Sequence, residues 1–200
     1  MKKIFLSFIL IAVGISGALA QQSIYELKGG VLFPQDTETG TIIGLSVGHM
    51  ADENLGWAFE TQYFWRTYTQ EYRTDQQTIV TEIENSTKML PLMVKIMYLS
   101  QIAPSLDLRV SGGIGYAFLW NKEANYLIGV EESKSFSGFA WELGAGVSIP
   151  ISRAADFFGE LNYFYSTPSR DAGKTIEGLP QRTEIDMSGL VIRIGVRIYN

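Results

Sequence analysis

The stretch Gly189–Tyr199, "GLVIRIGVRIY", alternates aliphatic side chains with glycine, valine, arginine and tyrosine almost to the end of the 200-residue chain. Successive side chains of a β-strand point to opposite faces of its sheet, so one face of this strand is wholly aliphatic. The other face carries Arg193 and Arg197. The stretch therefore predicts one strand of a wall that has an oily side and a polar side.

Eight segments with this period occur along the chain, and most have the roughly 9–11 residues that a tilted strand needs to cross a bilayer. They are 24–33, 41–50, 57–69, 89–99, 106–120, 138–149, 156–166 and 189–199. The connections alternate between short turns and longer polar stretches, as they do in membrane barrels. The sequence predicts an all-β fold, an eight-stranded antiparallel up-and-down transmembrane β-barrel.

Charged residues and glycines share one face of these segments. The charges expected there are Glu26, Lys28, Glu60, Arg66, Lys95, Asp107, Arg109, Glu142, Glu160, Arg193 and Arg197, and Asp156 alone is assigned to the oily face. A lipid-facing Arg or Lys costs about 2–4 kcal/mol at mid-bilayer, and small residues suit the crowded interior of an eight-stranded barrel. We expect these charges to plug the lumen as a structural network. A soluble barrel with its oily face inward is the competing interpretation, which the glycines disfavour.

Aromatic residues on the oily face gather toward the segment ends, as two interfacial girdles would. The external girdle is expected to hold Phe33, Tyr63, Trp65, Phe118, Trp120, Phe139, Trp141, Tyr163 and Tyr165, and the periplasmic girdle Tyr25, Trp57, Phe59, Tyr98 and Phe157. An aliphatic band between two such girdles is typical of a surface in contact with lipid.

Residues 1–20, "MKKIFLSFILIAVGISGALA", have the basic start, apolar run and small-residue end of a secretory signal peptide cleaved after Ala20. The barrel domain is expected to occupy residues 21–200. Without Lys2 and Lys3 the mature chain has 16 − 2 = 14 basic and 21 acidic side chains, a net charge of 14 − 21 = −7. An acidic chain without a basic run argues against nucleic acid as a partner.

Catalytic and metal chemistry find little support. The one histidine, His49, is expected near the periplasmic end of its strand on the oily face, without an evident serine and acid beside it. With no cysteine and no second histidine, a transition-metal site is not expected. No cofactor is expected. Met89, Met93 and Met97 are expected to fill the lumen. Pro91 predicts a bulge or a later strand start.

The long external connections, 73–88, 121–137 and 167–188, are where specific binding is expected. A strand-like rhythm continues beyond the membrane span through Tyr68, Tyr72 and 79–80, so the third and fourth strands are expected to extend outward as an exposed hairpin. Exposed strand edges can recruit partner strands, which makes binding of a surface ligand one hypothesis. A solvated loop that only shields the barrel is the alternative.

The chain after the signal resembles the small eight-stranded outer-membrane barrels of diderm bacteria, the OmpA/OmpX-type, porin-like barrel domain. The resemblance implies a place in the outer membrane, contact with outer-membrane lipid and lipopolysaccharide, and recognition of the last strand by the barrel-assembly machinery. Gly195, Ile198 and Tyr199 would form that assembly signal, although Tyr199 is penultimate where the family usually ends on an aromatic residue.

The favoured function is that of a non-enzymatic outer-membrane barrel with a structural or surface-interaction role and a plugged lumen. Two alternatives remain open at this point. One is a narrow transporter for small or hydrophobic solutes, and the other is a lipid A-modifying outer-membrane enzyme.

Overall fold

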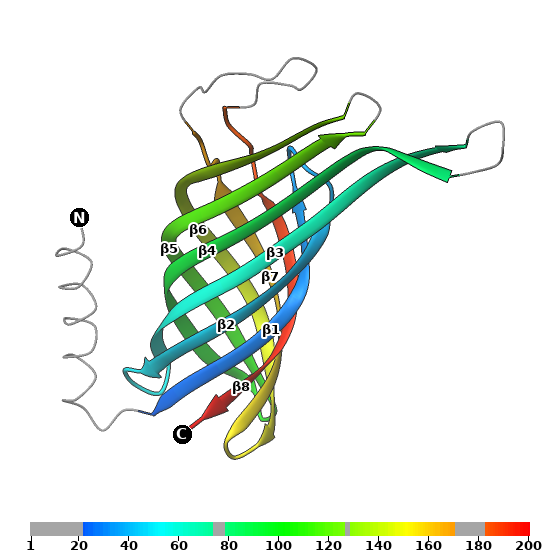
Figure 1. The fold of residues 1–200 in the computed structure, drawn as a ribbon. Coiled ribbons are helices and arrows are strands. Elements are labelled where there is room, and N and C mark those ends of the chain that lie inside the picture. Colours follow the sequence, from blue (N-terminus) through cyan, green and yellow to red (C-terminus); the bar gives the residue numbers. More distant parts are fainter. Residues whose placement is uncertain (1–21, 74–78, 127–128, 171–182) are drawn as a thin grey trace.

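The computed structural model describes residues 22–73, 79–126, 129–170 and 183–200, which form one closed antiparallel barrel (Figure 1). Its strands are β1 (Ser23–Pro34), β2 (Gly40–Met50), β3 (Leu55–Arg73), β4 (Ile79–Ala103), β5 (Leu106–Asn125), β6 (Val130–Ser152), β7 (Ala155–Ser166) and β8 (Gly189–Tyr199). Each strand pairs with the next in sequence, and β8 closes the ring against β1. The predicted fold is confirmed. The signal peptide expected at residues 1–20 lies outside the described residues.

The barrel wall is apolar outside and polar inside, as the alternation predicts. In β8 the Ile194 side chain is 58% exposed, whereas Arg193 and Arg197 on the other face are 1% and 0% exposed. A protein in water would expose the arginines and bury the isoleucine. The outer surface of the described barrel therefore suits hydrocarbon. No helix within the described ranges is long and apolar enough to cross a membrane.

Asp156 faces the lumen, and its assignment to the oily face was wrong. Its position in β7 has the same parity as that of Glu160, and its side chain is buried. The hydroxyl of Tyr199, from β8, donates a hydrogen bond to the Asp156 carboxylate at 2.5 Å. A single parity therefore accounts for the charged side chains of β7.

Four strands continue well beyond the external mouth of the barrel. The ladders between β3 and β4 and between β5 and β6 run to the pairs Arg73↔Ile79 and Asn125↔Val130, and Figure 1 shows the four strands leaning outward together. The extended β3–β4 hairpin is thus confirmed, but residues 121–137, expected as a loop, are largely strand. Outside the membrane a strand needs no oily face, so the alternation that marks strands in the sequence is lost there.

Pro91 neither begins β4 nor causes a bulge. It pairs with Ala117 of β5. On the β3 side, Thr61 pairs with Leu92 and Phe64 pairs with Met89 in the same register, but the two positions between them are not paired. Because proline lacks the N–H that a ladder bond requires, the local loss of pairing satisfies it without a shift of register.

Two apolar clusters fill the lumen above and below its charged middle. The external cluster includes Phe64, Met89 and Phe136, and the periplasmic cluster includes Ile24 and Met97. The lumen-filling role expected of the three methionines is confirmed, because Met93 is buried as well.

The end of the β7–β8 connection supplies part of the external cluster. Ile185 and Met187 are buried in it, and their backbone N–H groups donate to the carbonyls of Pro168 and Ser166 at 3.1 and 2.9 Å. This described end of the connection therefore helps to fill the barrel mouth, which its irregular sequence did not indicate.

Gly29 and Gly30 are adjacent in β1 and point to opposite faces of the barrel wall, so substitutions at them test which face is crowded. A Cβ at Gly30 would overlap the Ile192 backbone, whereas a Cβ at Gly29 would lie 3.9 Å from the Ile42 carbonyl oxygen. Gly30→Leu should destabilise the barrel by about 3 kcal/mol or more, because overpacking forces the backbone to shift. Gly29→Leu should change stability by less than about 1 kcal/mol. Urea unfolding in detergent micelles measures both, and equal losses would show that the inside and outside are assigned wrongly.

Candidate functional site

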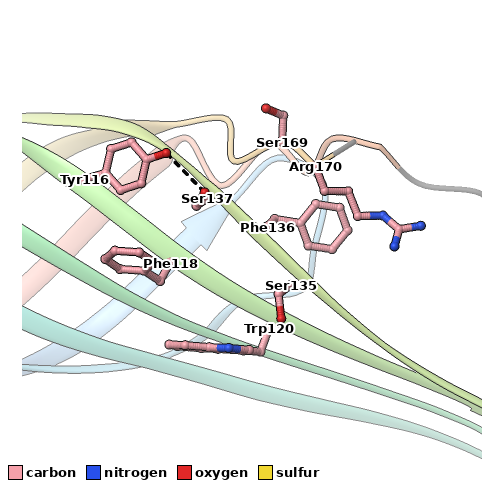
Figure 2. Close-up of a pocket in the computed structure, with 8 residues that line it drawn as sticks. All are labelled: Tyr116, Phe118, Trp120, Ser135, Phe136, Ser137, Ser169 and Arg170. Atoms are coloured by element: carbon pink, nitrogen blue, oxygen red, sulfur yellow. Dashed lines mark hydrogen bonds between the residues drawn. The ribbon is translucent and has the colours of Figure 1, made fainter. Parts of the chain in front are cut away.

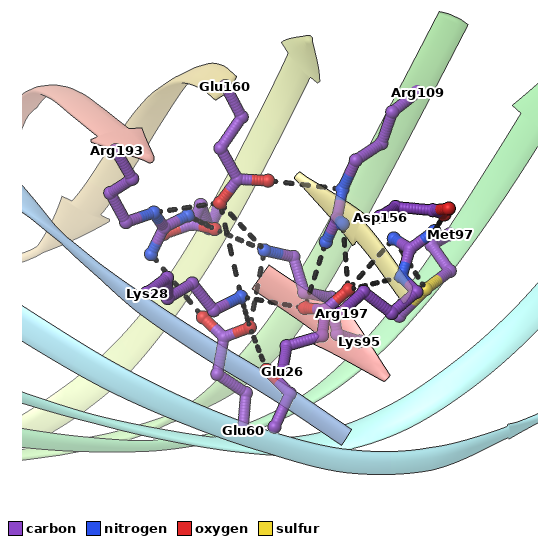
Figure 3. A network of polar contacts seen from close by, with 12 residues as sticks. Glu26, Lys28, Glu60, Lys95, Met97, Arg109, Asp156, Glu160, Arg193 and Arg197 are labelled. Atoms are coloured by element: carbon purple, nitrogen blue, oxygen red, sulfur yellow. Dashed lines mark hydrogen bonds and ion pairs between the residues drawn. The ribbon is translucent and has the colours of Figure 1, made fainter. Parts of the chain in front are cut away.

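Nine charged side chains converge in the middle of the lumen, where they are shielded from solvent (Figure 3). They are Glu26 and Lys28 of β1, Glu60 of β3, Lys95 of β4, Arg109 of β5, Glu142 of β6, Glu160 of β7, and Arg193 and Arg197 of β8. The remaining strand, β2, contributes Ser46, whose hydroxyl donates to Glu60 at 2.9 Å. Every strand of the ring therefore contributes to this luminal ion layer.

Glu26 anchors the periplasmic side of the layer. Its carboxylate accepts two hydrogen bonds from the guanidinium of Arg109, at 2.7 and 3.0 Å, one from Arg197 Nε at 2.9 Å and one from Lys28 Nζ at 3.1 Å. Paired bonds from one guanidinium are among the strongest that a carboxylate accepts, and they fix both side chains in orientation. Glu26 thus connects β1 across the lumen to β5.

Glu60 and Glu142 share their cations on the external side of the layer. Lys95 Nζ lies 3.3 Å from Glu60 and 2.8 Å from Glu142, and Arg193 pairs with both carboxylates. Gln62 donates its amide N–H groups to the same two carboxylates. This sharing satisfies charges that would be costly if they were buried alone.

Glu160 is held mainly by Coulomb attraction. Arg193 Nε and Arg109 Nε lie 2.8 and 3.2 Å from its oxygens, but neither N–H is aligned to form a hydrogen bond. Lys28 and Lys95 lie farther away, each at 3.9 Å. Its central position lets this carboxylate balance four cations that also have other partners.

Phe158 and Asp156 complete the layer, and the sequence analysis assigned neither to it. The guanidiniums of Arg109 and Arg197 lie 4.4 and 5.9 Å from the Phe158 ring centroid, a cation–π arrangement. Arg197 also lies 4.0 Å from Asp156. With Asp156 included, five acids face five bases and the formal charge of the layer is zero. The parity of both residues in β7 was the signal that could have identified them.

Glycines make room for these long side chains. In the ladders Lys28 lies opposite Gly44 and Gly195, Lys95 opposite Gly113, and Arg193 opposite Gly30. Arg109 and Glu160 both lie opposite Gly146 of β6. An eight-stranded barrel has space for little more than its own side chains, so the glycines opposite these side chains allow the side chains to lie across the lumen. The shared face of glycines and charges is thereby explained.

Arg66 and Asp107 lie outside the luminal ion layer, although both were expected in it. Arg66 pairs with Glu38 of the β1–β2 connection at the external rim, where the two side chains are 42% and 47% exposed. Asp107 is half-buried at the periplasmic end of β5 and takes part in none of the ion pairs formed among the described residues. Strand parity gives the face of a residue but not its depth, and these two lie too close to the barrel ends.

The expected girdle residues all lie on the outer face, where several contact one another. Trp141 stacks on Tyr165 at a centroid distance of 5.5 Å, and Trp57 packs edge-on against Phe59 at 5.6 Å. His49 lies 5.7 Å from the Trp57 ring on the same surface. The outer face therefore carries aromatic contacts near both ends of the strands.

The geometry offers no evident catalytic centre among the described residues. Ser23 Oγ lies 3.4 Å from His49 Nδ1, so a serine is present after all, but no described carboxylate orients the imidazole. No group of three or more potential metal ligands occurs in the described part of the chain. The luminal carboxylates are engaged by cations on every side. The arrangement can close a pore, but it presents no free nucleophile or base.

The ion layer makes a direct stability prediction. Glu26→Gln leaves Arg109, Arg197 and Lys28 with a buried excess of charge, and breaking a buried pair typically costs about 3–5 kcal/mol. The same change at exposed Glu38 should cost no more than about 1 kcal/mol. Urea unfolding in micelles checks both variants. Equal, small losses would mean that the layer contributes no more to stability than a surface ion pair.

The fold is shared with several solved structures at low sequence identity. Neisserial surface protein A matches with a TM-score of 0.58 at 10% identity over 91% of this chain and 98% of its own. The outer membrane protein OprG from Pseudomonas aeruginosa matches with a TM-score of 0.56 at 15% sequence identity, and the match covers 90% of this chain and 95% of OprG. Ail, the attachment invasion locus protein of Yersinia pestis, matches with a TM-score of 0.52 at 14% sequence identity, and the match covers 90% of this chain and 100% of Ail. The outer membrane protease OmpT from Escherichia coli matches with a TM-score of 0.53 at 6% sequence identity, and the match covers 92% of this chain and 100% of OmpT.

No curated protein matches the sequence significantly. The profile of the family described as "Outer membrane protein beta-barrel domain", however, matches residues 7–197, nearly the full length. Together with the closed ring and its apolar outer face, this match shows that the chain belongs to the outer-membrane protein β-barrel family.

Proposed function

We propose that this chain is a non-enzymatic protein of the bacterial outer membrane whose lumen is closed and whose role is interaction at the cell surface. The observation that carries the proposal is a contrast between the two ends of its strands. Inside the membrane span the strands enclose a filled lumen, whereas outside it four of them project as a sheet.

The filled lumen supports a closed state. The luminal ion layer lies between two apolar clusters, so a polar solute would have to pass buried Phe64 and Met89, and an apolar solute would meet ten charged side chains. Eight strands give a ring only wide enough to be filled by its own side chains. A transport path for small or hydrophobic solutes would require both kinds of layer to move.

The projecting sheet supports a role in binding. Beyond Trp65, β3 has no β2 partner, and before Gly138 the only link from β6 toward β7 among the described residues is the bridge from Ser137 to Ser169. Among the described residues, neither outer edge of the sheet has a strand paired along its length, and an extended segment of a ligand can add as a strand to such an edge.

The structural relatives permit more than one role. Ail is named for attachment and invasion, and OmpT is described as a protease. We favour the attachment type because His49, the one histidine of the chain, lies on the lipid-facing side at the periplasmic end, and no acid among the described residues orients it. The heparin analogue bound to Ail is a poor guide to the ligand, because each of the four external connections here has a net negative charge.

Two further partners belong to the proposal. Outer-membrane lipid and lipopolysaccharide would surround the girdles. The barrel-assembly machinery would read β8, since this last strand must pair with β1 to close the ring. Gly195, Ile198 and Tyr199 remain the expected signal, with Ile198 pointing to lipid and Tyr199 toward the lumen.

A closed lumen predicts the electrical behaviour of the folded protein. In planar bilayers at neutral pH it should give no steady conductance, because the ion layer and the apolar clusters leave no continuous water path. Single-channel recording of protein whose folding has been verified by heat-modifiable migration on gels measures this. A reproducible open level from such protein would favour the transporter over the closed barrel.

Shortening the β3–β4 hairpin tests the surface role. Replacing residues 68–85 by Asn-Gly joins Thr67 to its cross-strand partner Ser86 by a tight turn and leaves the barrel intact. Cells that display this variant should lose attachment to epithelial monolayers and to one another, whereas Glu38→Gln, at the rim but outside the sheet, should retain it. Adherent-cell counts at matched surface expression give the answer. Unchanged attachment would remove the sheet from the proposed function.

A further inference from the structure

The lipid-facing surface of the barrel has an apolar groove at Gly112 of β5. The groove has a volume of about 680 Å³ and is lined by Val94 and Ile96 of β4 and by Trp141 and Leu143 of β6. Gly112 points outward, unlike the glycines beside the ions. A Cβ built there would meet only the flexible end of Leu143, at 3.1 Å, and the Glu142 carbonyl, at 3.9 Å. The backbone does not demand glycine here, so the missing side chain is what creates the groove.

A second hollow lies on β5 and β6 near the external mouth. It has a volume of about 490 Å³ and lies between the aromatic rings of Tyr116, Phe118 and Trp120 and the more polar side chains of Ser135, Ser137 and Arg170 (Figure 2). Tyr116 and Ser137 share a hydrogen bond of 3.2 Å. The hollow therefore combines ring surfaces with hydroxyl and guanidinium donors.

The two hollows lie along one strip of the outer wall. Ile114 pairs with Trp141, Phe118 with Ser137 and Trp120 with Ser135, so the strip follows the β5–β6 ladder from Gly112 to the rim. Six residues of strand from Gly112 to Phe118 span about 20 Å, or about 15 Å of depth at a tilt of about 40°. This depth is half of a hydrocarbon core about 30 Å thick. The groove and the external hollow are thus separated by the thickness of one leaflet.

Positive charge gathers at the external end of the strip in an otherwise acidic protein. Lys88 is exposed and lies cross-strand from Trp120, on the β4 side. Arg170 lies on the opposite side, with its guanidinium 5.5 Å from the Phe136 ring centroid. Two cations therefore flank an aromatic platform at the level where lipid headgroups lie.

We propose that this β5–β6 strip is a specific site for one molecule of lipopolysaccharide, bound through its lipid A part. One acyl chain occupies the Gly112 groove, the sugar packs on Phe118 and Trp120, and the phosphates contact Lys88 and Arg170. Serine hydroxyls donate to the sugar or phosphate oxygens. An outer-leaflet glycolipid with two phosphates matches two separated cations better than a phospholipid with one phosphate does. The site rests on the lipopolysaccharide contact proposed above and locates it on one strip, but it does not depend on attachment through the projecting sheet.

The test uses the folded full-length mature protein in detergent micelles and native mass spectrometry with purified lipid A. The expected result is one retained lipid A per barrel. Gly112→Leu fills the groove, and Lys88→Gln/Arg170→Gln removes the cations, so each variant should bind about tenfold more weakly. The matched controls are Gly29→Leu, at an outward glycine of β1, and Arg66→Gln/Arg153→Gln, which removes two cations elsewhere. Both controls should bind as the parent does.

Two competitors distinguish the source of the phosphate. Dephosphorylated lipid A and phosphatidylglycerol should each displace the bound lipid poorly. The proposal would be overturned if Gly112→Leu and Gly29→Leu lost binding equally, or if all variants retained lipid A equally. Ready displacement of the lipid by phosphatidylglycerol would overturn it as well. Heat-modifiable migration verifies folding of each variant. If Gly112→Leu does not fold, the double glutamine variant and its control decide the outcome.

Discussion

The structure depends on the rule that hydrocarbon tolerates no unpaired charge. Ten charged side chains of the strands must therefore lie inside the ring, where they form a layer of five acids and five bases. A one-residue slip of a strand that carries these ions would turn its charges toward lipid, so the layer helps to fix the register. Buried ion pairs contribute little net stability compared with apolar packing, and specificity of pairing is the better account of this layer.

The ion layer also determines where glycine must occur. Lys28 lies between Gly44 and Gly195, and Arg193 lies opposite Gly30, so that each long side chain crosses the lumen over a residue without one. The cost is the poor strand propensity of glycine, which the closed hydrogen-bond ladder of a barrel offsets. The outward Gly112 lacks this justification because no ion lies beside it on the outer face. A glycine without a packing reason thus leaves the lipid-facing groove open.

Period-two alternation was sufficient to predict the strands, the two faces and most members of the ion layer from the sequence. It could not give depth, so Arg66 and Asp107 were placed in the layer although they lie near the barrel ends. It indicated the outward extension of β3 and β4 but not that of β5 and β6, since a strand with both faces in water needs no alternation. Ile185 and Met187 were missed for a related reason, because a connection that folds across the barrel mouth buries side chains without any period.

The closed lumen and the projecting sheet are linked by β3, β4, β5 and β6, which belong to both. β5 runs without interruption from Leu106 to Asn125, and its Tyr116–Trp120 portion lies where the strand passes from the barrel to the open sheet. Neighbouring strands of an open sheet twist relative to one another, so the direction of the sheet depends on what holds this junction. Inside, Phe136 and Leu119 pack in the external cluster, and outside Tyr116, Phe118 and Trp120 are exposed on the apolar wall. Packing on both sides of the same short stretch is how a membrane-embedded ring can direct a sheet into solvent.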